Sequence, residues 1–279
     1  MKLVSFSIDG GSVRPGALVE EANLVADLSV VGYADALSVV TAGITTLHPP
    51  GTYTGHKISE VRLHAPLANP PRIFAIGLNY RDHAAEAKMA LPPAPVVFYK
   101  MIPSIIGTGD AIVLPKNSTE PDYEAELAFV VGKGGYRIPA SAWREHVYGY
   151  TIINDVSARD VQRSTSQWSL SKSFPTFCPM GPAIVTADEI ADPHELSIGL
   201  SINGETLQNS NTRELVFKVP ELIEYISSIT PLLPGDIVST GTPSGVGMGR
   251  TPQRWLRPGD SVTVAVKGLG FLSNPVVAE

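Results

Sequence analysis

The 279-residue sequence predicts an α+β fold that is rich in β-strands. Eight short segments carry β-branched and aromatic residues at the density typical of strands, whereas only two segments beyond residue 66 have the pattern of a helix. The 25 glycines and 24 prolines indicate many turns between short elements. Because helices are so few, the pattern disfavours an alternating, doubly wound α/β sheet.

The composition argues against a nucleic acid or a membrane as the partner. With 27 acidic and 21 basic residues the formal charge is −6, and no basic run is present to neutralise the phosphates of a nucleic acid. No apolar run reaches the length of a membrane span, and the first residues lack the regions of a secretion signal. The single cysteine, Cys178, excludes an internal disulfide and is expected to be an inert core thiol. We therefore expect a cytoplasmic protein with a small-molecule substrate.

Residues 1–66 are predicted to form a small N-terminal domain. Apolar stretches at 3–8 and 17–28 are broken by glycines and a proline, which indicates hairpins, and a short helix is expected around 35–40. Pro66, Pro70 and Pro71 mark the boundary, because proline lacks a donor for a sheet and restricts the residue before it. Residues 67–279 would then form the larger, catalytic domain.

The larger domain contains the eight strand candidates, which are residues 73–78, 111–114, 124–131, 148–154, 183–186, 197–202, 237–240 and 261–267. Asn203-Gly204 predicts a two-residue hairpin turn, and Pro-Gly-Asp precedes a strand twice, at 234–236 and 258–260. The helix candidates are 220–229, which begins with proline and has one apolar face, and 82–89.

Three carboxylates suggest a cation site. Glu124 and Glu126 lie two residues apart in a predicted strand and therefore share a face whose further members are apolar. If that face is buried, the two acids must share a proton or a cation; the alternative is a solvated strand edge. Asp155 ends another apolar strand, where it could join the pair or simply cap a turn. An all-oxygen set suits Mg²⁺ or Mn²⁺, with Ca²⁺ as a further option.

Two further segments carry candidate catalytic groups. His83 and Glu86 would face each other on the helix, and such a carboxylate orients an imidazole for use as a general base, although this spacing is also common in surface helix pairs. Lys172 lies in a serine-rich and aromatic stretch, where it could meet an anionic ligand or stay solvated. The loop at 240–247 follows a strand but lacks the lysine of a phosphate loop.

Ordered motifs over residues 72–270 resemble the fumarylacetoacetate hydrolase family. They are Gly-Leu-Asn-Tyr-x-x-His-x-x-Glu at 77–86, Asp-Tyr-Glu-x-Glu-Leu at 122–127, Asn-Asp-Val-Ser-Ala-Arg-Asp-x-Gln at 154–162, Lys-Ser-Phe at 172–174, Cys-Pro-Met-Gly-Pro at 178–182, Asn-Gly-Glu at 203–205, Gln-Asn-Ser-Asn-Thr at 208–212 and Pro-Gly-Asp-Ile-Val-Ser-Thr-Gly-Thr-Pro at 234–243. One departure is Ser171, where many relatives have glycine. The resemblance implies mixed β-sheets rolled around a central metal site, a small N-terminal domain and a homodimer.

The resemblance also implies roles for individual residues. Glu124, Glu126 and Asp155 correspond to ligands of a divalent cation, usually Mg²⁺ or Mn²⁺. His83 and Glu86 match a catalytic dyad on a segment that orders as a lid, and Lys172 matches an active-site lysine. The positions that hold substrate are matched by Arg159, Gln162 and Thr242.

This set of residues predicts a hydrolase that cleaves a carbon–carbon bond of an acylpyruvate or another 2,4-dioxo acid and releases pyruvate. His83 would activate water, while the metal and Lys172 would stabilise the developing enolate. The same enolate arises when oxaloacetate loses carbon dioxide, so the alternative is a decarboxylase or isomerase of small 2-oxo diacids. A non-catalytic metal-binding or ligand-sensing protein would be expected to lack one of the motif residues, and all are present.

Overall fold

The computed structural model describes residues 1–47 and 53–279, and its largest feature is a mixed twelve-stranded sheet. Ten strands form a continuous path and two more pair beside it, β5 (Arg62–His64) on β1 and β8 (Ile105–Ile106) on β14. The path runs β4 (Thr54–Lys57), β3 (Leu24–Asp27), β2 (Arg14–Val19), β1 (Lys2–Ser7), β14 (Cys178–Thr186), β12 (Val147–Asn154), β11 (Ala125–Val131), β17 (Ile237–Ser239), β6 (Ile73–Gly77) and β7 (Val96–Lys100).

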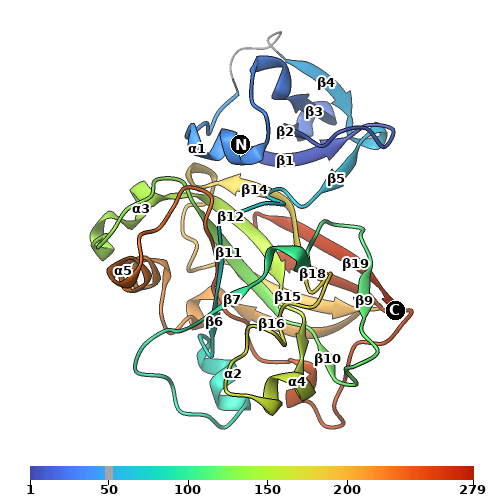
Figure 1. Cartoon of the computed structure of the whole chain (residues 1–279), viewed down its shortest axis with the longest axis vertical. Helices are drawn as coiled ribbons and strands as arrows, with labels where there is room; N and C mark the ends of the chain where they lie inside the picture. Colours follow the sequence, from blue (N-terminus) through green and yellow to red (C-terminus); the bar gives the residue numbers. More distant parts are fainter. Residues whose placement is uncertain (48–52) are drawn as a thin grey trace.

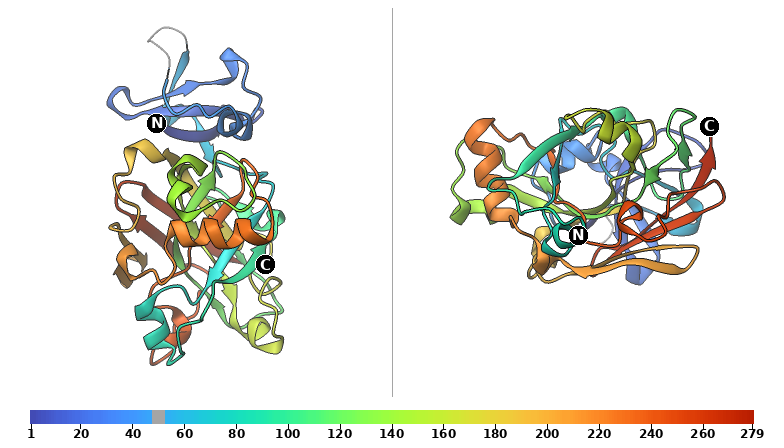
Figure 2. Two further views of the ribbon diagram at one scale, coloured as in Figure 1. Left: turned by 90° about the vertical axis from the view of Figure 1, so that its left-hand side faces the viewer. Right: turned by 90° about the horizontal axis from the view of Figure 1, so that it is seen from below.

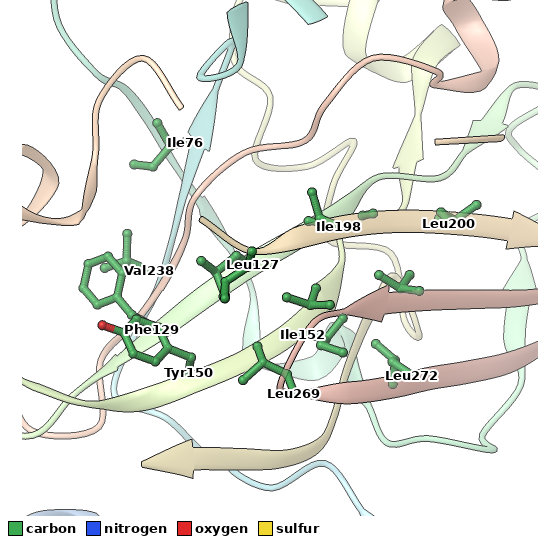
Figure 3. Packing of buried hydrophobic residues seen from close by; sticks show 14 of the residues in the cluster. Ile76, Leu127, Phe129, Tyr150, Ile152, Ile198, Leu200, Val238, Leu269 and Leu272 are labelled. Atoms are coloured by element: carbon green, nitrogen blue, oxygen red, sulfur yellow. The ribbon is translucent and has the colours of Figure 1, made fainter. Parts of the chain in front are cut away.

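A second sheet packs against the middle of the first. Its five strands are, in order, β16 (Glu205–Asn211), β15 (Ser197–Ile202), β18 (Ser261–Val266), β19 (Gly270–Ala278) and β9 (Ile112–Leu114). Figure 3 shows Leu127 and Ile152 of the large sheet facing Ile198 and Leu200 of the small one, all in one buried cluster. The two views in Figure 2 show the sheets curving around the centre of this body. The expected β-rich α+β class with rolled mixed sheets is confirmed.

Strand β11 is buried on both faces, which determines the environment of its acidic residues. Leu127 and Phe129 point into the cluster between the sheets, whereas Ala128 and Val130 join a second buried cluster. Glu126 lies on the same face as this second pair, because side chains alternate along a strand. Since neither face is solvated, the alternative of a solvated strand edge is wrong for these acids.

The N-terminal strands form a separate-looking layer above the main body (Figure 1). They are joined to it by β1, whose Lys2 and Leu3 pair with Val185 and Ile184 of β14. Leu3 also belongs to the same buried cluster as Val130 of β11. The division into a small N-terminal domain at 1–66 and a catalytic domain at 67–279 stays a prediction.

Most predicted elements are present. The helices at 220–229 and 35–40 are α5 (Val219–Ile229) and α1 (Ala36–Thr41), and Asn203 and Gly204 both have the positive φ of the predicted hairpin turn. The helix predicted at 82–89 is shorter, α2 (Arg81–Glu86), because the chain becomes left-handed at Lys88, where φ is 53°. Sequence patterns missed β7, β19 and the short helices α3 (Trp143–His146) and α4 (Arg159–Ser164).

Two smaller expectations concern the membrane and the thiol. No helix in the described part of the chain has both the length and the apolar character needed to cross a membrane. Cys178 lies fully buried in β14, and burial raises the pKa of its thiol to about 12. A thiol that stays protonated is a poor nucleophile, so the structure agrees with an inert core cysteine.

Candidate active site

The three carboxylates predicted as metal ligands form one buried cluster. Strands β11 and β12 are antiparallel, with Ala125 opposite Asn154, so the start of one strand lies beside the end of the other. The Asp155 N–H donates to the carbonyl of Glu124 at 2.9 Å. One ligand oxygen of Glu124, of Glu126 and of Asp155 lies within 4.8 Å of the others. Strand pairing therefore brings together residues that are about 30 positions apart.

Three cationic side chains surround two of these carboxylates. Arg159 donates to Oε1 of Glu124, and Lys100 donates to Oδ1 of Asp155 at 2.6 Å. Lys172 Nζ lies 2.7 Å from both remaining oxygens, Oε2 of Glu124 and Oδ2 of Asp155. Each carboxylate thus has one oxygen on a separate cation, while the other oxygens converge on Lys172.

Glu126 has no cationic partner among the described residues. Its Oε2 accepts hydrogen bonds from Ser239 Oγ at 2.5 Å and from the Gly241 N–H at 2.9 Å. Burial raises the pKa of Glu126 well above its ordinary value, and the nearby charges of Asp155 and Glu124 raise it further. A carboxyl in this position is stabilised either by a proton or by a cation.

The charges have the opposite effect on Glu124. Burial alone would raise its pKa, but the Lys172 ammonium and the Arg159 guanidinium outweigh burial and lower the pKa to about 2. Glu124 is therefore ionised at neutral pH. Glu124 and Asp155 lie beside Glu126, and all three offer only oxygen ligands. Such a set fits a hard divalent cation such as Mg²⁺ or Mn²⁺.

Two buried charged residues of this cluster were not singled out from the sequence. Lys100 is the last residue of β7, which itself was missed, and its signal was a lysine at the end of an apolar run. Asp122 accepts from Arg159 Nε at 2.8 Å and from the Gly247 N–H at 2.7 Å. It belongs to the Asp-Tyr-Glu motif, but nothing in that motif indicated that it would fix Arg159.

The His83–Glu86 pair lies on helix α2. His83 is buried, and its Nδ1 lies 3.3 Å from Oε2 of Glu86. The Gly245 N–H lies 3.0 and 3.1 Å from the two oxygens of Glu86, which holds that carboxylate against the 240–247 loop. The interpretation of this pair as an exposed surface pair is therefore wrong for His83. With Nδ1 facing Glu86, Nε2 is the nitrogen left for a ligand.

A cavity of about 340 Å³ brings most of the predicted residues together. It is lined by seven of the nine, namely His83, Glu124, Glu126, Arg159, Gln162, Lys172 and Thr242. The other two do not line it, because Asp155 is completely buried and Glu86 contacts Nδ1 of His83 from outside the lining. The rest of the wall is largely apolar, with Ile76, Leu78, Met89, Phe98, Trp168 and Met248.

The residues predicted to hold substrate are themselves fixed by hydrogen bonds. Arg159 Nη1 donates to Gln162 Oε1 at 2.9 Å. Thr242 Oγ1 accepts from Gln208 Nε2 at 2.9 Å, and Oε1 of the same glutamine accepts from the Ala125 N–H at 2.9 Å. Gln208 is fully buried and was a further residue that sequence reasoning missed, although it lies in the Gln-Asn-Ser-Asn-Thr motif.

The comparison with known families agrees with this geometry. The model of the fumarylacetoacetate (FAA) hydrolase C-terminal family matches residues 72–277. The chain belongs to the fumarylacetoacetate hydrolase family. The matched region begins just after the three prolines and contains all nine predicted site residues.

Curated members of the fumarylacetoacetate hydrolase family are similar over much of their length. The mitochondrial oxaloacetate tautomerase fahd2 of Xenopus laevis is 42% identical over 99% of this chain and 90% of the relative. The oxaloacetate tautomerase YisK of Bacillus subtilis is 44% identical over 79% of this chain and 75% of the relative.

Solved structures of the family share the fold. A fumarylacetoacetate hydrolase from Exiguobacterium antarcticum superposes with a TM-score of 0.89 at 36% identity and covers both chains completely. A maleylpyruvate hydrolase from Sphingobium, solved with manganese(II) and pyruvate, has a TM-score of 0.83 at 29% identity and covers 100% of this chain and 99% of the other. The family thus contains both tautomerases and hydrolases.

Proposed function

We propose that this protein is a divalent-metal-dependent isomerase that interconverts the keto and enol forms of a 2-oxo diacid such as oxaloacetate. The observation that carries the proposal is that the buried imidazole of His83 lines the same cavity as Glu124 and Glu126. The sequence motifs alone favour a carbon–carbon hydrolase. Relatives 42–48% identical to this chain are named oxaloacetate tautomerases, and this supports the isomerase alternative instead.

The acidic cluster is the proposed cation site. Glu124, Glu126 and Asp155 would hold Mg²⁺ or Mn²⁺ through one oxygen each, because their ligand atoms converge and Glu126 has no other cation among the described residues. When bound, the cation would hold the 2-oxo-carboxylate end of the substrate and polarise its keto group. A neighbouring family structure contains manganese(II) together with pyruvate, which is consistent with this assignment.

His83 is the proposed acid–base group. Its Nε2 would take a proton from C3 of the keto form while the C2 oxygen gains one from solvent, and the reverse transfers regenerate the keto form. Glu86 would stabilise the imidazolium, since its carboxylate lies 3.3 Å from Nδ1. Lys172 would stabilise negative charge at the inner end of the cavity, while Arg159, Gln162 and Thr242 would position the substrate.

The test follows the loss of the enol absorbance of oxaloacetate in the presence of Mg²⁺ or Mn²⁺. We expect catalysis by the wild type, its loss on chelation, and a fall of at least about 100-fold in His83→Asn. His194→Asn is the matched control, because His194 also contacts a carboxylate, Asp192 at 3.0 Å, but does not line the cavity. Full activity of His83→Asn, or catalysis in chelator, would refute the proposal.

Hydrolysis of an acylpyruvate is the second candidate function. It is favoured by the structural similarity to a maleylpyruvate hydrolase. The same His83–Glu86 pair could take a proton from water instead of from C3 of the substrate. Release of pyruvate and acetate from acetylpyruvate, faster than tautomerisation of oxaloacetate, would establish it. Release of pyruvate from oxaloacetate in step with metal loading would instead indicate a decarboxylase.

We also propose a homodimer located in the cytoplasm. The dimer is implied by the family resemblance, whereas animal relatives are named as mitochondrial. Light scattering on the purified protein and fractionation of cells test the two statements, and a monomer or an organellar signal would overturn them.

A further inference from the structure

Among the described residues, four side chains that can carry positive charge line the cavity, and three of them belong to the site already described. These are His83, Arg159 and Lys172. Arg159 donates from Nε to Asp122, from Nη1 to Gln162 and from Nη2 to Glu124, so three of its five N–H groups are already used within the site. Lys172 is shared between two carboxylates. The fourth cation, Arg163, has no such buried partner.

Arg163 lies one helical turn after Arg159 on α4, and therefore on the same side of that helix. Figure 1 shows α4 and α2, the helix of His83, both at the end of the body opposite the N-terminal strands. The side chain of Arg163 is 55% exposed, while Glu124 and Glu126 are buried, so Arg163 lies toward the mouth of the cavity and the carboxylates at its inner end.

Among the described residues, Arg163 has one ion-pair partner, and that partner is partly exposed. Its Nη2 pairs with Glu120, whose side chain is 26% exposed. Surface ion pairs of this kind contribute little to stability, because water screens both charges. A carboxylate entering the cavity can therefore replace Glu120 with little loss, and the guanidinium can bind it through two parallel hydrogen bonds.

We propose that Arg163 binds the distal carboxylate of the substrate and makes the site selective for 2-oxo diacids over 2-oxo monoacids. This inference rests on the proposed function, which places the 2-oxo-carboxylate end at the acidic cluster. The lining also includes the apolar Ile76, Phe98 and Trp168. Its other cations among the described residues, which are His83, Arg159 and Lys172, already pair with carboxylates of the site. Arg163 is thus a specificity-determining residue at the mouth of the cavity.

The experiment compares a ligand that has a distal carboxylate with one that lacks it. For Arg163→Gln, we expect the KM for oxaloacetate to rise about tenfold, because a charge-assisted pair is lost, with kcat within about twofold. Inhibition by oxalate, which reaches only the inner end, should change less than about twofold. Arg163→Lys should lie between the wild type and Arg163→Gln, because the charge remains without the planar fork.

Two further variants serve as a gain-of-binding test and a control. Glu120→Gln removes the competing carboxylate and should lower the KM for oxaloacetate. Arg62→Gln should change neither the KM for oxaloacetate nor the inhibition by oxalate. Arg62 is 69% exposed and pairs with Asp110, which is 23% exposed, and neither residue lines the cavity. This matches the exposure of the Arg163–Glu120 pair.

Other results would refute either the role of Arg163 or the proposed function. An unchanged KM for oxaloacetate in Arg163→Gln refutes the role of Arg163. An equal weakening of oxaloacetate and oxalate also refutes it, because the substitution would then disturb the whole cavity. If wild-type protein with Mn²⁺ neither binds oxalate nor acts on oxaloacetate, the proposed function itself fails, and the wild type alone reveals this.

Discussion

Replacing Lys100 by methionine tests whether the buried charges hold one another in place. The side chain of Lys100 is completely buried, donates to Oδ1 of Asp155 at 2.6 Å and also contacts the carbonyl of Lys172. Methionine is close in length but carries no charge. In Lys100→Met, Asp155 therefore keeps Lys172 as its cation and loses its other ionic contact.

The expected loss of stability is large. Removing one partner of a buried ion pair typically lowers the free energy of unfolding by about 3–5 kcal/mol, because the other charge stays buried without compensation. At about 2–4 °C per kcal/mol for a chain of this size, the melting temperature of the metal-free variant should fall by about 6–20 °C. Mn²⁺ should raise the melting temperature of the variant more than that of the wild type. The added cation would compensate the negative charge of Asp155 that Lys100 no longer balances.

The assay is thermal unfolding in chelator and in Mn²⁺, with two comparison variants. Lys133→Met is the matched control, because Lys133 is 66% exposed and its pair with Glu145 lies at the surface, so its melting temperature should change by less than about 2–4 °C. Lys100→Met/Asp155→Asn should recover part of the loss, since both charges are gone. If Lys100→Met melts within about 2 °C of the wild type in chelator, the reasoning is refuted.

Three further predictions concern cation binding, a buried amide and the loss of stability at acid pH. Glu124→Gln should abolish the stabilisation by Mn²⁺, which in the wild type should reach about 2.7 kcal/mol at 100 times the Kd; an unchanged shift would contradict the ligand assignment. Gln208→Ala removes the acceptor of the Ala125 N–H and should lower the free energy of unfolding by about 1–3 kcal/mol, whereas a neutral effect in denaturant titration would contradict the account of this buried amide. Burial alone would raise the pKa of Asp260, but hydrogen bonds from Arg254 and neighbouring groups lower it below its ordinary value of 3.8. Its contribution is therefore complete above about pH 5, roughly one unit above the ordinary pKa, and is lost as the pH falls through the lowered pKa, so Asp260→Asn should lose less stability than the wild type between pH 5 and 3.

Local patterns identified the carboxylates of the site as candidates. The two-residue period places Glu124 and Glu126 on one face, and an acid at the end of an apolar strand marks Asp155. What the pattern left open was burial, because an alternating strand can cover a core on one side and face water on the other. The second buried cluster, to which the N-terminal strands contribute Leu3 and Ala17, decided that question.

Partners from distant strands could not be predicted in the same way. Lys100 reaches Asp155 only because β7 follows β6 at the edge of the large sheet, a pairing set by tertiary structure. The role of Arg159 is a similar case. The family resemblance suggested a substrate-binding residue, yet its guanidinium contacts Asp122 and Glu124, which precede it by more than 30 positions. Its direct contact with substrate stays a prediction.

The charges of the cluster explain why a cation and a diacid suit the same site. Four buried acids face three buried bases, so the cluster carries a net charge of −1 when all are ionised; they are Asp122, Glu124, Glu126 and Asp155 against Lys100, Arg159 and Lys172. A divalent cation would change this to +1, and a dianionic 2-oxo diacid would return it to −1. Every state stays within one charge of neutrality, which limits the cost of burying the ions. A monoanionic acid would leave the loaded cluster neutral without needing Arg163, whereas the second carboxylate of a diacid adds the charge that Arg163 can neutralise at the mouth.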